Sequence, residues 1–283
     1  MNSSEFNKRK DSFDVAVLKN LTVIVFAVII NSINSLLLYT AFKNPVFTQE
    51  PRYILYMQLI INDIITLTVC VTLFVFTYLV PNMNVAICCI LLLIASSVYK
   101  NTALNLAGMA IERYVAICYP LHHARICTVQ NTKILIGIIW LMGALPGIVD
   151  LFVVLALRPL SFFTTSRMCY QQNVYMCSVW VLLFYTYFNV LFSAKAAASG
   201  PAQAQKARRT ILLHGVQLLL CTLSLFTTVN YQSAIYFTTF TLTSILPRLL
   251  SPLIYGMRDQ KFKKYMKSSL MCGSNKRAID PSD

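Results

Sequence analysis

Residues 109–120 read Met-Ala-Ile-Glu-Arg-Tyr-Val-Ala-Ile-Cys-Tyr-Pro, and they close a long apolar segment with an adjacent acid and base, Glu112 and Arg113. The apolar segment begins near residue 85. It is therefore long enough to cross a hydrocarbon core of about 30 Å, which takes about 20 apolar residues in a helix. Alone, the charged pair is only a solvated helix end, because exposed ion pairs contribute little free energy. Its meaning depends on the face of the membrane at which it lies.

The composition is that of a membrane protein, with 57% hydrophobic and 12% charged residues, far from the balance of a soluble domain. Apolar segments of spanning length recur at residues 17–40, 53–79, 85–118, 134–157, 176–194, 210–229 and 233–255. We predict an all-α membrane protein with three parts. These are an extracellular tail at 1–16, a seven-transmembrane-helix bundle at 17–255, and a cytoplasmic amphipathic helix with a tail at 256–283.

The basic residues predict the orientation in the membrane. The connections after the first, third, fifth and seventh segments, together with the C-terminal tail, hold most of the lysines and arginines. The positive-inside rule then places the N-terminus outside the cell and the C-terminus in the cytoplasm. The net charge of +14 accordingly indicates contact with anionic membrane lipid rather than with nucleic acid.

Two opposite charges are predicted to meet inside the membrane. At 1.5 Å per residue, Asp63 lies about 16 Å from Arg52, and Arg248 lies about 15 Å from Arg258. Equal depth and opposite sign predict a buried ion pair, since neither charge has another partner in hydrocarbon. In the alternative, Arg248 extends to the interface and Asp63 is satisfied by a polar neighbour: Asn34, Thr102 or Ser251.

A third charge, Lys100, lies midway along the third segment and needs a partner or water. Its helical face is shared by Leu92, Ala95, Ser96 and Tyr99. A face with a base, a phenol and a hydroxyl predicts a ligand pocket with Tyr99 and Lys100 at its floor. The alternative is a structural lysine bonded to neighbouring helix carbonyls. Asp150 is expected at the outer rim as a solvated helix end.

The outer face has candidate modification sites. Asn2-Ser3-Ser4 is a glycosylation sequon, although such a short motif also occurs by chance. Cys88 or Cys89 begins the third segment, and Cys169 or Cys177 lies in the outer loop. That compartment is oxidising, so a disulfide is expected, but spacing does not decide which cysteines pair.

The cytoplasmic tail alternates apolar and basic side chains over residues 259–270, which predicts an amphipathic helix on the membrane surface. Cys272 follows it as a candidate palmitoylation site. The sequence has no nucleophile elbow, no phosphate-binding glycine loop and no metal-ligand spacing around its histidines. We therefore predict neither an enzyme nor a bound metal or cofactor, and we interpret His122-His123 as a solvated loop.

Together, motifs spread over nearly the whole chain resemble those of odorant receptors in the rhodopsin-like G-protein-coupled receptor family. They occur in order: Asn34; Pro51-Arg52-Tyr53 followed by Asp63; Met109 to Tyr114; Trp140; Lys206-Ala207 with Thr210 and His214; and Ser251-Pro252-Leu253-Ile254-Tyr255. Leu104 to Gly108 and Leu213 to Cys221 look like the teleost fish group. Single matches are unspecific, whereas the ordered set is specific.

The resemblance implies that an odorant binds among the outer halves of helices three, five, six and seven, and that a stimulatory G protein is activated. It also implies a disulfide between Cys88 and Cys169. It assigns the coupling switch to five positions: Glu112, Arg113, Tyr114, His214 and Tyr255. Asn34, Asp63, Thr102, Arg248 and Ser251 are then the buried polar core.

Three departures from the family pattern leave alternatives open. Ser251 stands where the wider family usually has Asn, the outer loop between segments four and five is short, and almost nothing separates segments six and seven after Val229. A divergent, poorly signalling or non-olfactory receptor is one alternative function. The other is a channel or transporter that uses Asp63, Lys100 and Arg248 as its path.

Overall fold

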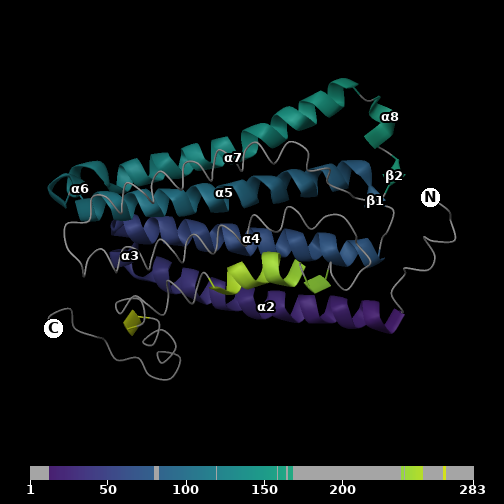
Figure 1. Cartoon of the computed structure of the whole chain (residues 1–283), viewed down its shortest axis with the longest axis horizontal. Coiled ribbons are helices and arrows are strands. Elements are labelled where there is room, and N and C mark those ends of the chain that lie inside the picture. The colour runs from purple at the N-terminus through teal and green to yellow at the C-terminus, as the bar shows by residue number, and fades with distance from the viewer. Residues whose placement is uncertain are drawn as a thin grey trace.

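Four long helices dominate the computed structural model (Figure 1). They are α2 (Phe13–Lys43), α4 (Pro51–Leu79), α5 (Val85–Cys118) and α7 (Val129–Leu157). Short elements connect them: α3 (Pro45–Gln49), β1 (Met83–Asn84), α6 (Pro120–Ile126), α8 (Leu160–Phe163) and β2 (Ser166–Arg167). The structure describes residues 13–79, 83–118, 120–157, 159–163, 165–167, 237–238, 240–250 and 264–265.

The first four predicted segments are confirmed as helices. Within the described ranges, 4 helices are long and apolar enough to cross a membrane. The first, second and fourth begin earlier than predicted, at Phe13, Pro51 and Val129, because helical hydrogen bonding continues beyond the apolar stretch that the sequence marks. The predicted segments 176–194 and 210–229 lie outside the described residues. So does most of the predicted amphipathic helix.

The helix α4 lies between α2 and α5, and α5 lies between α4 and α7 (Figure 1). Residues 240–250 form a further helical run, and its part Thr241–Ile245 contacts α2 and α4. The bundle has two ends, which we call the α6 end, with α3 and α6, and the β end, with β1 and β2 (Figure 1). At the β end the two strands pair antiparallel, with Met83 opposite Arg167.

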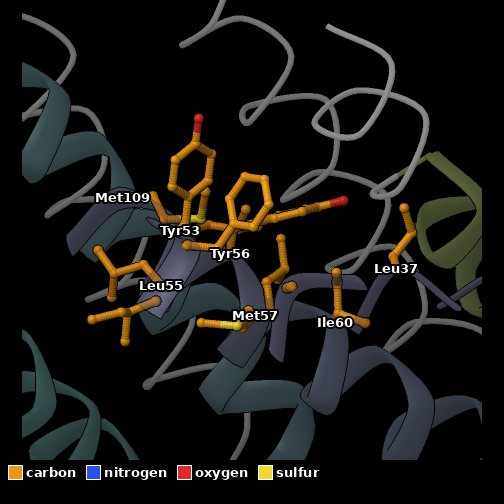
Figure 2. Packing of buried hydrophobic residues seen from close by; sticks show 12 residues of the cluster. Leu37, Tyr53, Leu55, Tyr56, Met57, Ile60 and Met109 are labelled. Atoms are coloured by element: carbon orange, nitrogen blue, oxygen red, sulfur yellow. The ribbon is translucent and has the colours of Figure 1, made fainter. Parts of the chain in front are cut away.

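Two apolar clusters fill the space between the helices. The cluster toward the α6 end includes Leu37, Phe47, Tyr53, Leu59, Ile60, Leu106 and Met109 (Figure 2). The cluster toward the β end includes Val23, Ile30, Leu67, Cys70, Phe74, Phe240 and Ile245. Along α2, α4 and α5, buried polar residues fall between the two clusters. We call Asn34, Asp63, Thr102 and Arg248 the polar layer.

Close packing of α5 on α7 depends on small residues. A Cβ atom added at Gly143 would overlap Asn101 Oδ1 and would lie 3.1 Å from the Ser97 carbonyl oxygen. One turn further along α7, a Cβ atom at Gly147 would lie 3.5 Å from Ser96 Oγ. Glycines spaced by four residues let two membrane helices approach closely, where van der Waals contact holds them together.

We predict that Gly143→Ala lowers the thermal stability of the purified protein by about 1–3 kcal/mol, because Asn101 and α5 must move to accept the methyl group. Gly137→Ala is the matched control on the same helix, since nothing lies within 4 Å of its added Cβ atom. It should be neutral or slightly stabilising. Equal melting temperatures for the two variants would contradict the close contact.

Candidate functional site

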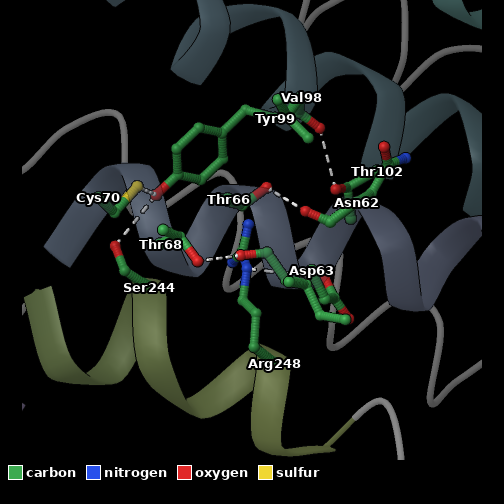
Figure 3. Close-up of polar contacts among 11 residues, drawn as sticks. Asn62, Asp63, Thr66, Thr68, Cys70, Val98, Tyr99, Thr102, Ser244 and Arg248 are labelled. Carbon is green, nitrogen blue, oxygen red and sulfur yellow. Dashed lines mark hydrogen bonds and ion pairs between the residues drawn. The ribbon is translucent and has the colours of Figure 1, made fainter. Parts of the chain in front are cut away.

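The predicted ion pair is present at the centre of the bundle. Arg248 Nε lies 3.7 Å from Asp63 Oδ1, and their side chains are 0% and 1% exposed. Arg248 therefore does not extend to an interface, so that alternative is wrong. Thr102 is turned to its own helix, where its hydroxyl donates to the Val98 carbonyl (Figure 3). Asn34 is fully buried in the same layer.

Tyr99 of α5 contacts both of the helices that carry the ion pair (Figure 3). Its hydroxyl lies 3.1 Å from Ser244 Oγ and 3.3 Å from Cys70 Sγ, within hydrogen-bonding distance of both. The guanidinium carbon of Arg248 lies 4.9 Å from the centroid of the Tyr99 ring. A cation over an aromatic face is attracted to it, the more so away from water. One side chain of α5 thus contacts α4 and the 240–250 helix.

The helix that provides Ser244 and Arg248 contains an irregular turn. Residues Thr241–Ile245 form a π-helix, in which the Leu246 amide donates to the Thr241 carbonyl. Pro247 follows, and it has no amide hydrogen and crowds the carbonyl four residues before it. This wider turn lies about one turn before Pro247 and gives the proline ring room. Such turns are frequent at functional sites.

The predicted ligand-binding face is divided between two neighbours. Ser96 is buried against α7 and donates to the Leu93 carbonyl at 3.1 Å, whereas Tyr99 turns toward α4. Leu92 is half-buried, and Ala95 and Lys100 are buried. These side chains share a stripe of α5, but helical spacing alone does not show that Ser96 packs on a glycine of α7.

At the α6 end, Glu112 meets a histidine. His123 Nε2 lies 3.2 Å from Glu112 Oε1, whose side chain is nearly buried. The interpretation of His123 as a solvated loop residue is therefore wrong: α6 is helical and turns His123 back onto α5, whereas His122 is exposed. Partial burial and the charge of Glu112 raise the pKa of the nearby Cys127 thiol. Arg113 follows Glu112 within α5.

At the β end, Cys88 is disulfide-bonded, whereas Cys89 is free. Of the two candidate cysteines on α5, Cys88 is thus the bonded one. Both possible partners, Cys169 and Cys177, lie outside the described residues. The same holds for the remaining predicted site residues: Asn2, His214, Ser251, Tyr255 and Cys272. Tyr265 of the predicted amphipathic helix packs against Phe47, with ring centroids 5.4 Å apart.

Two contacts of this site were not predicted. The first is the contact between Tyr99 and Ser244. Ser244 lies one helical turn before Arg248 on the same helix face, and this spacing was the sequence signal that could have placed it near the ion pair. The pairing of His123 with Glu112 had no comparable signal, because it depends on the course of the chain between α5 and α6. Across the described ranges, no group of three His, Cys, Asp or Glu side chains is arranged to hold a metal ion.

Comparison with known proteins places this geometry in a family. The model of the seven-transmembrane receptors of the rhodopsin family matches residues 33–255. The chain belongs to that family. It is therefore a multi-pass membrane receptor and not an enzyme.

Individual relatives agree with the resemblance to odorant receptors. The receptor is 30% identical to the zebrafish odorant receptor 131-2 over 96% of this chain and 93% of the relative. It is 26% identical to the human olfactory receptor 4K2 over 83% of this chain and 82% of the relative. The rat neurotensin receptor type 1 is 28% identical but covers only 38% of this chain and 28% of its own length. Similarity to odorant receptors therefore extends over the whole bundle.

We predict that removing one partner of the ion pair is far more damaging than removing both. Asp63→Asn or Arg248→Gln alone leaves a buried charge uncompensated and should cost about 3–5 kcal/mol of stability. The double variant should recover much of that loss. Thermal unfolding of the purified receptor measures this double-mutant cycle. Additive losses in the double variant would show that the two charges do not stabilise each other.

Proposed function

We propose that this receptor binds an odorant and in response activates a stimulatory G protein that raises cyclic AMP. The whole-length similarity to odorant receptors supports the ligand class. The observation that carries the proposal is the network of Asp63, Arg248, Tyr99 and Ser244, which joins α4, α5 and the 240–250 helix between the two apolar clusters.

The proposed orientation has the N-terminus and the β end outside the cell and the α6 end in the cytoplasm. Seven helices and a short membrane-surface helix complete the bundle, and Cys88 pairs with Cys169. The pairing of Met83 with Arg167 supports that disulfide, because it holds the start of α5 beside the chain just before Cys169. Glycosylation at Asn2 and palmitoylation at Cys272 fit the same orientation.

The proposed switch lies at the cytoplasmic end, where Glu112 and Arg113 end the third helix together with Tyr114. Ligand binding shifts a two-state equilibrium of the bundle. Movement of the 240–250 helix at the Tyr99 contacts carries that shift toward Tyr255. His214 on the sixth helix belongs to the same switch. Arg113 is then released for the G protein.

A conduction path is the weaker second function. It requires polar residues through the full depth of the membrane. Among the described helices, Asp63, Lys100 and Arg248 lie between the two apolar clusters, and the fourth buried charge, Glu112, lies apart from them at the α6 end. This arrangement favours a receptor over a channel or transporter.

We expect cells that express the receptor to raise cyclic AMP when they are screened with water-borne odorants. Arg113→Ala should reduce the response to that of cells without the receptor, at equal surface expression, since Arg113 is the proposed contact of the G protein. A response that Arg113→Ala leaves unchanged would refute the mechanism. Surface receptor that gives no response to any odorant would favour the divergent, non-signalling alternative.

We also expect His123→Ala to raise cyclic AMP in the absence of ligand by about 2- to 10-fold, the range for one lost hydrogen bond of typical strength. The contact between His123 and Glu112 holds α6 against α5 in the described state. His122→Ala is the matched control on the same helix, because His122 is exposed. Equal basal signals from the two variants would exclude this role for His123.

A further inference from the structure

Lys100 is a buried cation in the middle of α5, with only 3% of its surface exposed. Asp63 and Arg248 compensate each other in the neighbouring layer. Lys100 has no such ion-pair partner among the described residues. A buried charge is costly unless it is paired, so an anion is expected to accompany it.

Among the residues that the structure describes, no carboxylate forms an ion pair with Lys100, although the exposed Asp150 acts on it electrostatically. The chain contains 10 acidic residues in all, and none of them lies between residues 151 and 258. The fifth, sixth and seventh segments therefore cannot provide an acid, whichever way they pack. Seven of the others belong to the ends of the chain or to the connection after α2: Glu5, Asp11, Asp14, Glu50, Asp259, Asp280 and Asp283.

The remaining three acids are Asp63, Glu112 and Asp150. Asp63 pairs with Arg248, and Glu112 contacts His123 about 18 Å along α5 from Lys100. Asp150 on α7 acts electrostatically on Lys100 but is itself exposed. It lies beyond Gly147, which faces Ser96, and so it is nearer to the β end than Lys100 is. No described residue forms an ion pair or hydrogen bond with the Lys100 amine.

We propose that the counter-ion of Lys100 is the ligand, a small organic acid whose carboxylate pairs with the ammonium group while its apolar body lies among the apolar side chains of the bundle. The proposal rests on the proposed receptor function and names its ligand class. Carboxylic acids are ionised at neutral pH. A monoanion balances the single charge of Lys100, whereas a dianion would leave a negative charge buried. Association is non-covalent and reversible.

The test compares wild-type receptor with Lys100→Met, Lys100→Arg and the control Lys133→Met, which removes an exposed lysine from α7. The ligands are straight-chain carboxylic acids with their methyl esters, alcohols and aldehydes of the same length. Cyclic AMP in cells and the melting temperature of purified receptor are both measured. A ligand that binds the folded state raises the melting temperature without any need for signalling.

We expect acids to activate and stabilise the wild type and Lys133→Met. Lys100→Met should weaken the effect of acids by about 10- to 100-fold, the range for a hydrogen bond between charged groups, while Lys100→Arg keeps it. Without ligand, Lys100→Met should melt at or above the wild-type temperature, because it removes an unpaired buried charge. This result would also show that the variant folds.

The outcomes separate the ligand class from the receptor function. Acids that stabilise the wild type but not Lys100→Met, with no cyclic AMP response, would support the ligand class and refute the coupling. A cyclic AMP response to esters or alcohols but not to acids would support the receptor and overturn the ligand class. Acids without effect in both measurements would also overturn the ligand class. Aldehydes that act on the wild type but not on Lys100→Arg would overturn it as well, because they would indicate an imine, which only the primary amine of lysine can form.

Discussion

The ion pair between Asp63 and Arg248 is the constraint on which the rest of the bundle depends. Neither charge is tolerable alone in an apolar interior, so α4 and the 240–250 helix must meet at one relative height. This contact lies between the two apolar clusters. The clusters contribute most of the buried apolar surface, but apolar contact is non-directional. The ion pair is directional, and it therefore fixes the height of one helix relative to the other.

Tyr99 extends that constraint to α5. Its ring lies against Arg248, and its hydroxyl reaches Cys70 and Ser244. Ser244 is part of the π-helical turn, so the least regular backbone of the described helices lies beside the most polar part of the interior. Packed helix interfaces change between discrete arrangements rather than by continuous deformation, which is what a two-state receptor needs. The proposed switch at Glu112 and Arg113 lies at the far end of the same α5 helix.

The packing of α5 explains why one helix can serve both the ion-pair network and the proposed switch at Glu112 and Arg113. On the α7 side, Gly143 and Gly147 let the two backbones approach closely, and this side contributes rigidity. On the α4 side, α5 presents Tyr99 and also Asn105, whose amide donates to the Leu55 carbonyl. Lys100 follows Tyr99 in the chain, so the proposed counter-ion site adjoins the network that would transmit its occupation.

The sequence by itself determined the membrane class, the positions of the first four spans and the depth of each buried charge, because apolar length and the rise of a helix set these quantities. The ordered motifs determined the family. Equal depth was enough to predict the pairing of Asp63 with Arg248. Only the tertiary structure decided which neighbour each side chain meets. Three contacts show this: Ser96 with α7, Ser244 with Tyr99, and His123 with Glu112. The first two depend on how the helices rotate about their axes, and the third depends on the path of the connection between α5 and α6. Depth along a helix is a local property of the chain, whereas rotation toward a neighbour is set by the packing of all the helices together.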